Sequence, residues 1–236
     1  SARQSTSETQ TGVIGLSNQR YAIYPNMGTN LTAGSGVSVG TNGVSVFEHA
    51  YAYLPSLLVY DAPIVGWTHI AVVYQDKQPF LYVNGSLVRT GLVSVASATY
   101  PSTSLGEGAY GAGLYYGFYA GLLDEVSVYD RSLTAAEIQA ICKAGSAGKC
   151  LVPPTDGLVL YYPFNGNAND ESGNGNHGTV NGATLTPDRF GDANSAYYFN
   201  GVNNDILVPE TLFGASAEAA TISVWITFDG GPYWQH

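Results

Sequence analysis

The sequence is poor in charged residues, in cysteine and in long apolar runs. Only 11% of the residues are charged, and eight Lys and Arg stand against 18 Asp and Glu, which gives a net charge of −10. Because the chain has no basic stripe, we expect it not to bind nucleic acid. No apolar run approaches the ~20 residues that a membrane-spanning helix needs, so we expect no membrane span. The chain begins with Ser1 rather than Met, and we interpret it as a processed or excised part of a longer protein.

The only two cysteines, Cys142 and Cys150, enclose a short segment that contains two glycines. No nearby His or further Cys offers a metal site, which favours a local disulfide at the end of a helix. Such a disulfide implies an oxidising compartment, and we expect an extracellular protein, secreted or at the cell surface. Two free thiols are the alternative interpretation.

Glycine, tyrosine and alternating apolar residues dominate instead, with 29 Gly and 18 Tyr. Residues 66–75 and 121–130 are apolar runs typical of strands, and residues 78–91 form a predicted hairpin. The hairpin turns at Asn84-Gly85, a pair that readily takes the positive φ angles of a type I′ turn. The pattern predicts an all-β protein, a two-sheet antiparallel jelly-roll sandwich.

One short helix is expected after the strand at 121–130. Thr134 and Glu137 have the spacing of a capping box, and the helix should stop near Gly145. We expect Ile138 and Ile141 to pack onto the sandwich. This role is structural.

Two long segments resemble a known family. WTHIAVVYQDKQPFLYVNGSLV with GLLDEVSVYDRSLTAAEIQAI resembles the C-terminal half of a laminin-G-like domain of the concanavalin-A-like lectin superfamily. DGLVLYYPFNGNANDESGNGNHG through DILVP, followed by TISVWI, resembles the N-terminal half of the same module. The resemblance covers most of residues 60–228, and residues 1–60 match only loosely.

The two halves occur here in inverted order. Residues 1–142 resemble the C-terminal part of the sandwich, residues 143–156 form a Cys/Pro linker, and residues 157–236 resemble the N-terminal part. The chain is therefore either one circularly permuted sandwich or a window cut out of phase from an array of modules. Because half a sandwich exposes unpaired edges and a bare core face, the halves must meet within one chain or between chains.

The resemblance implies a structural calcium ion near the Asn-rich loop and the LDEV strand. In that strand residues 122, 124, 126 and 128 share one face, so we expect Asp124 to point toward the core with the valines. A buried carboxylate needs a partner, and Ca²⁺ takes oxygen ligands from carboxylates and amides. Either Asp124 caps a loop at a frayed strand end, or it is a calcium ligand together with Asp170, assisted by Asn165 and Asn174. The loop itself, residues 165–178, is either floppy or ordered by such a ligand.

Catalysis is not expected, although the superfamily includes glucanases. Asp124 and Glu125 are adjacent, so they should face opposite sides of a strand, and no Glu-x-Asp-x-x-Glu pattern is present. No Gly-x-Ser-x-Gly elbow occurs, and the four histidines lack zinc spacing. We read His69 as a core or groove residue, and Trp67 and Trp225 as core.

Exposed aromatic residues could form a ligand surface. The run at residues 108–121 alternates aromatic and small residues, and Tyr115, Tyr116 and Tyr119 are candidate ligand contacts, as is Trp234. They could stack on sugars or form a protein–protein interface. We therefore expect a non-catalytic module that binds a glycan or an extracellular protein. The alternative is a structural subunit that binds itself head to tail and forms a filament.

Overall fold

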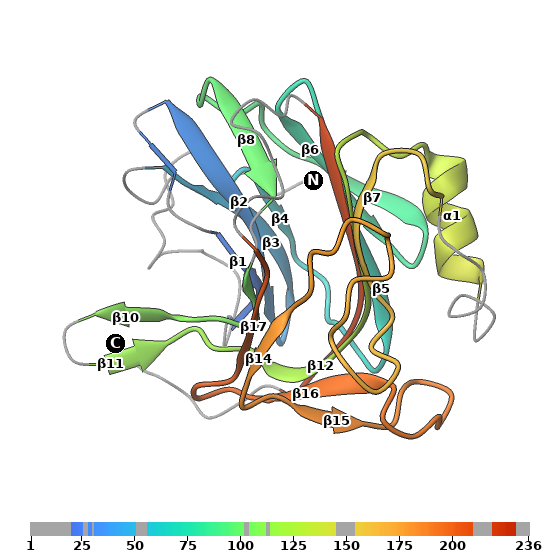
Figure 1. Ribbon diagram of the computed structural model, residues 1–236. Helices are drawn as coiled ribbons and strands as arrows, with labels where there is room; N and C mark the ends of the chain where they lie inside the picture. Colours follow the sequence, from blue (N-terminus) through green and yellow to red (C-terminus); the bar gives the residue numbers. More distant parts are fainter. Residues whose placement is uncertain are drawn as a thin grey trace.

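Two facing β-sheets form the body of the computed structural model, and one helix lies outside the second sheet (Figure 1). The structure describes residues 20–25, 28–29, 31–50, 56–101, 104–111, 114–144, 154–209 and 219–229, with backbone alone at 109–111 and 114–116. The predicted all-β, two-sheet sandwich with one short helix is confirmed. Every strand pair is antiparallel except β2 with β8, which is parallel.

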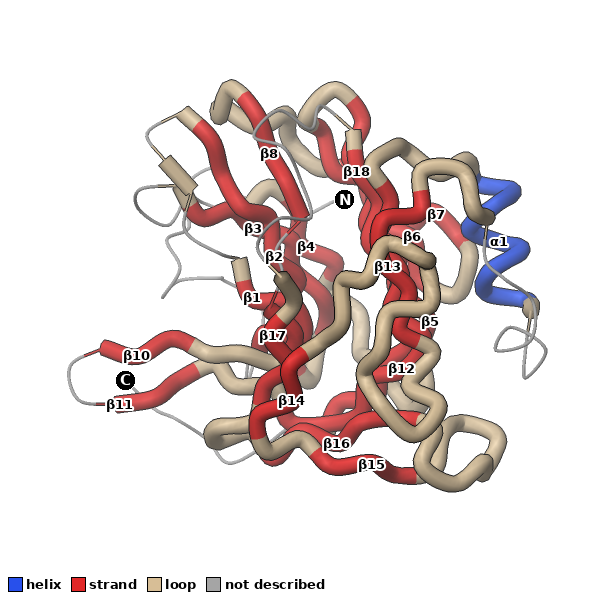
Figure 2. Tube along the Cα trace, in the orientation of Figure 1, coloured by secondary structure: helices blue, strands red, loops and turns tan. Residues whose placement is uncertain are grey.

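The strand order mixes segments that are distant in the sequence. The first sheet contains, in spatial order, β14 (Thr179–Asn181), β17 (Asp205–Leu207), β9 (Ser104–Leu105), β1 (Arg20–Tyr24), β2 (Thr32–Gly40), β3 (Gly43–His49) and β4 (Leu58–Tyr60), and β8 (Ala98–Pro101) pairs with β2. The second contains β15 (Thr184–Thr186), β16 (Ala196–Asn200), β12 (Ala120–Tyr129), β18 (Ala220–Phe228), β5 (Thr68–Gln75), β6 (Gln78–Val83) and β7 (Ser86–Thr90), and β13 (Leu158–Tyr162) pairs with β12. A two-stranded sheet of β10 (Ala109–Gly111) and β11 (Leu114–Tyr116) projects from the body (Figure 2).

Strands from both halves of the sequence share each sheet. β12 pairs with β13, β16 and β18, which all come from residues 157–236. In the first sheet, β17 pairs with β9. Strands of the two segments therefore pair with one another in this structure. The relation of this order to an array of modules, and the linker boundaries at 143–156, stay predictions.

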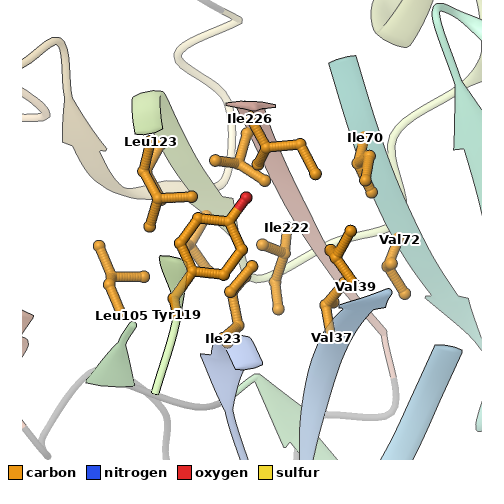
Figure 3. Close-up of a cluster of buried hydrophobic side chains, with 14 of the residues drawn as sticks. Ile23, Val37, Val39, Ile70, Val72, Leu105, Tyr119, Leu123, Ile222 and Ile226 are labelled. Atoms are coloured by element: carbon orange, nitrogen blue, oxygen red, sulfur yellow. The ribbon is translucent and has the colours of Figure 1, made fainter. Parts of the chain in front are cut away.

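The core lies between the sheets and follows from the alternation of the strands. Side chains from β1 and β2 meet side chains from β5, β12 and β18, as Figure 3 shows for Ile23, Val37, Ile70, Leu123 and Ile222. A smaller cluster lies on the opposite face of the second sheet. Apolar residues on both faces of β5 explain why its sequence is an almost continuous apolar run.

The helix α1 (Ala135–Lys143) covers this smaller cluster. Thr134 and Glu137 form the predicted capping box, Ile138 is buried, and Ile141 packs against the cluster. The predicted tight turn is also confirmed, because Asn84 has a φ of 49° and Gly85 a φ of 75°. Within the described residues, no helix is long and apolar enough to cross a membrane.

Candidate functional site on the outer face of the second sheet

A β-bulge in β12 places Asp124 on the face opposite the core. Glu125 has a φ of 47°, and the register with β18 shifts between Asp124 and Ser127. Leu123 and Val126 both belong to the core, so one extra residue lies between two inward positions. The expectation that Asp124 points toward the core with the valines is therefore wrong, because the bulge interrupts the alternation on which it depended.

Arg189 joins the two adjacent carboxylates. Its Nη1 lies 3.1 Å from Asp124 Oδ2 and its Nη2 lies 2.9 Å from Glu125 Oε1. The Asp124 side chain is fully buried, and the Arg189 side chain is 6% exposed. The expectation that Asp124 and Glu125 face opposite sides is also wrong, because the left-handed backbone at Glu125 brings both to one guanidinium. Removing either member of such a buried pair leaves an uncompensated charge.

Two aromatic rings enclose the guanidinium. The Arg189 guanidinium carbon lies 4.4 Å from the Phe190 ring centroid and 4.3 Å from that of Trp225. Cation–π attraction is strongest where the cation is desolvated, as it is here. Trp225 is half-buried on the outer face and belongs to neither apolar cluster, which corrects its assignment to the core. Trp67 is also half-buried and outside both clusters.

The loop that carries Arg189 is held by its own hydrogen bonds. Asp188 Oδ1 accepts from the backbone N–H groups of Phe190, at 2.9 Å, and of Asp192, at 3.0 Å. Phe190 follows directly and remains 45% exposed. The loop therefore presents an aromatic ring to solvent above a buried ion cluster.

Register places further side chains on the same outer face of the second sheet. Tyr198 of β16 lies opposite Leu122 of β12, which lies opposite Thr227 of β18. Tyr197, Phe199 and Leu123 are core residues, so Tyr198 and Leu122 face outward, and Tyr198 is 38% exposed. Trp225 lies two residues from Thr227 along β18 and on the same face. We call Leu122, Arg189, Phe190, Tyr198 and Trp225 the outer platform.

His69 and Ser223 form a buried pair next to Trp225. His69 Nε2 lies 2.8 Å from Ser223 Oγ, and the two rings of His69 and Trp225 have centroids 5.3 Å apart. Burial, with a smaller contribution from Arg189, lowers the pKa of His69 to about 3, so the ring is neutral. A catalytic Ser–His pair needs an accessible hydroxyl and a group that orients the histidine. Both residues are buried and, among the described residues, His69 Nδ1 has no hydrogen-bond partner, so the pair shows neither feature.

Asp170 organises the Asn-rich loop with protein donors. Its Oδ1 accepts from the N–H of Tyr161 and of Ser172, both at 2.9 Å, and its Oδ2 accepts from Ser172 Oγ at 2.8 Å and Asn176 N at 3.0 Å. Burial acts to raise the pKa of Asp170, but these donors outweigh it and hold the pKa below its ordinary value. The loop is thus ordered by hydrogen bonds.

The predicted calcium ligands contact different protein groups in the structure. Asp124 binds Arg189 at the bulge, whereas Asp170 and Asn174 lie against β13, where Asn174 Nδ2 donates to Leu158 O at 3.0 Å. Asn165 is exposed. No group of three His, Cys, Asp or Glu side chains within the described ranges could hold a metal ion. Structural calcium and its ligand set stay predictions.

The predicted ligand-contact residues have three different outcomes. Tyr119 is fully buried in the core, and its hydroxyl donates to Thr227 O at 2.6 Å, so its assignment to a ligand-facing ridge is wrong. Tyr115 and Tyr116 lie in β11, where only the backbone is described. Trp234 lies outside the described residues.

The disulfide prediction concerns a residue that is likewise outside the described part. Cys142 is half-buried in the last turn of α1, and Cys150 is not described. The Cys142–Cys150 disulfide therefore stays a prediction.

Arg189 and Phe190 were missed by reasoning from the sequence. A signal for Arg189 was present: a buried carboxylate needs a cation, and the chain offers only eight Lys and Arg residues. Phe190 had no such signal, because a single aromatic residue in a polar loop is unremarkable.

Comparison with protein families gives one match. A family model for laminin-G-like domains, described as the Concanavalin A-like lectin/glucanases superfamily, matches residues 5–139. The match includes residues 5–60, a part of the chain where the sequence resemblance is only loose, and it ends before the segment 157–236. No curated protein and no solved structure matches the chain.

The matched residues cover more than half of the chain and carry β12 and most of α1. The two facing sheets agree with the sandwich that the family implies. The chain belongs to the laminin-G-like family of the concanavalin A-like lectin/glucanases superfamily.

Proposed function

We propose that this chain is a non-catalytic, extracellular binding module whose ligand is a glycan, bound on the outer platform. Family membership supports a binding module in general. The observation that carries the proposal is the presence of two exposed aromatic rings: Phe190 contacts the buried Arg189 ion cluster, and Tyr198 faces outward opposite Leu122 of β12. An extracellular protein is the other ligand class for the same surface.

The chemistry of the platform suits a neutral sugar. Exposed aromatic rings pack against the apolar faces of pyranose rings, and hydroxyl groups nearby bind sugar hydroxyls. Thr184 and Thr227 share the outward row with Tyr198 and Leu122. The net charge of −10 disfavours polyanionic glycans, so we propose a neutral one.

The carboxylates of the site support binding over hydrolysis. A glycosidase needs one protonated carboxylic acid and one carboxylate that both reach the substrate. Asp124 and Glu125 are both buried, and both bind Arg189, whose guanidinium contacts the Phe190 and Trp225 rings. This arrangement holds the platform in place.

A glycan array followed by titration calorimetry tests the proposal. We expect the wild-type chain to bind at least one neutral glycan, and Phe190→Ala to weaken that binding by about tenfold, or about 1.4 kcal/mol. Val95→Ala is the matched control, because Val95 is 89% exposed and lies in the β7–β8 loop. If Phe190→Ala and Tyr198→Ala both leave glycan binding unchanged, the glycan binds elsewhere on the chain. If no glycan on the array binds, the proposal of a glycan ligand is rejected.

Self-assembly into a filament remains the alternative function. The strands of the two segments already pair within one chain, which gives each half its complement without a neighbour. Light scattering distinguishes the two: a binding module is expected at the chain mass of 24.8 kDa, and a filament subunit at much larger masses.

A further inference from the structure

The outward edge of β13 is covered by side chains. β13 pairs with β12 along one side, and no described strand pairs with its other side. An uncovered strand edge presents unpaired N–H and C=O groups and is a template for another chain. In this chain the segment after β13 folds back beside it, as Figure 2 shows. We call residues 170–176 the strap.

The strap satisfies both backbone groups of Tyr161. The Tyr161 N–H donates to Asp170 Oδ1 at 2.9 Å, and the Tyr161 carbonyl accepts from the Glu171 N–H at 2.9 Å. These are the two bonds that an added strand would make at this residue.

Side-chain donors saturate the carbonyl groups at the start of β13. The Val159 carbonyl accepts from Ser172 Oγ at 3.2 Å, Asn174 Nδ2 at 3.0 Å and Asn176 Nδ2 at 2.9 Å. Asn174 Nδ2 also donates to the Leu158 carbonyl. Three alternate residues of the strap therefore aim their side chains at one edge.

Glycines between these residues make that arrangement possible. Gly173 and Gly175 have φ angles of 94° and 75°, which a residue with a side chain adopts only at a cost. Asp170 then fixes the strap from within, because it also binds Ser172 and the backbone N–H of Asn176. The strap is thus a built structure whose donors face β13.

We infer that the strap is an edge guard, which prevents β13 from pairing with β13 of a second copy of this chain. β13 has the sequence LVLYY, which carries no charge and has high strand propensity. Two such edges can pair antiparallel about a two-fold axis and join two second sheets into one. Natural sheets blunt their edges against this association, and here side-chain amides do so in place of a charge or a proline.

The test removes the asparagine donors of the guard without changing the core. Asn174→Ala/Asn176→Ala deletes the two side-chain amides that make three hydrogen bonds to the Val159 and Leu158 carbonyls. Asn165→Ala/Asn169→Ala is the control, because both asparagines are exposed in the same loop and their side chains make no hydrogen bond in the described structure. We expect the guard variant to form dimers as its concentration rises in size-exclusion chromatography with light scattering, while wild type and control stay at 24.8 kDa.

Amide hydrogen exchange locates the contact. In the dimer, the amides of residues 158–162 should be protected again, whereas in the dilute variant they should exchange faster than in wild type. A guard variant that keeps the native circular dichroism and stays monomeric at every concentration would overturn the inference. If the double variant does not fold, the same measurement is made on Asn176→Ala alone, with the same two outcomes. This variant keeps the hydrogen bond from the backbone N–H of residue 176 to Asp170.

Discussion

Glu48 is a buried carboxyl group whose ionisation should control the stability of the sandwich. It lies in β3 two residues from Val46, an inward core position, and it is fully buried. Ser94 Oγ donates to its Oε2 at 2.6 Å, and the Tyr74 hydroxyl donates to its Oε1 at 3.4 Å. Burial raises the pKa of Glu48 to about 7, although Ser94, Tyr74 and the charge of Lys77 act in the opposite direction.

The sign and size of the effect follow from proton linkage. In the unfolded chain Glu48 ionises with a pKa of 4.5, whereas the folded chain holds the proton until about pH 7. Glu48 therefore contributes stability below pH 4.5 that is lost as the pH rises through about 7. A shift of this size corresponds to about 3 kcal/mol in the free energy of unfolding.

Glu48→Gln isolates this contribution, because glutamine has the same shape and does not titrate. We expect the free energy of unfolding of the variant relative to wild type to rise by about 3 kcal/mol between pH 4.5 and pH 8.5. Urea unfolding followed by tryptophan fluorescence at each pH measures it, and taking the difference cancels groups that titrate in both proteins. The exposed Glu171→Gln is the control and should show no such trend. Parallel curves for wild type and Glu48→Gln would refute the reasoning.

Three further predictions concern the site and the core. Arg189→Met should lower the free energy of unfolding by about 3–5 kcal/mol, because Asp124 and Glu125 lose their shared cation; an unchanged urea midpoint would contradict a stabilising role for the cluster. Tyr119→Phe should cost about 1 kcal/mol through the lost bond to the Thr227 carbonyl, and a gain in stability would contradict it. A calcium chelator should lower the melting temperature if calcium binds the folded chain, whereas an identical melting curve would count against that prediction.

The parts of the fold that depend on local signals were predictable. The Asn84-Gly85 turn and the helix after Thr134 form as expected because each is determined by a few neighbouring residues. The two-sheet sandwich was likewise predictable, because the alternation of apolar residues is a local feature of each strand. Strand order was not predictable in this way, since pairing such as β12 with β18 depends on contacts between residues far apart in the sequence.

The prediction of the site from the sequence went wrong at one backbone position, Glu125. Alternation assigns each residue of a strand to one face only where the strand has no bulge. The bulge at Glu125, which has a left-handed φ, adds one residue between two inward positions. The predicted direction of the Asp124 side chain was therefore wrong, and so was its predicted separation from Glu125. The inference that a buried Asp124 needs a partner was correct. The assignment of Tyr119 to a ligand surface was wrong for a related reason. The sequence around an aromatic residue among glycines does not indicate whether its side chain faces solvent or the core.

The ion cluster connects the two segments of the chain as directly as the sheets do. Asp124 and Glu125 come from the segment that precedes the linker, whereas Arg189 and Phe190 come from the segment that follows it. The outer platform is divided in the same way, because Leu122 comes from the first segment and the other four residues come from the second. The outer platform therefore exists only where the two halves have closed over one another. Binding through the outer platform therefore requires that both segments are folded together in one sandwich.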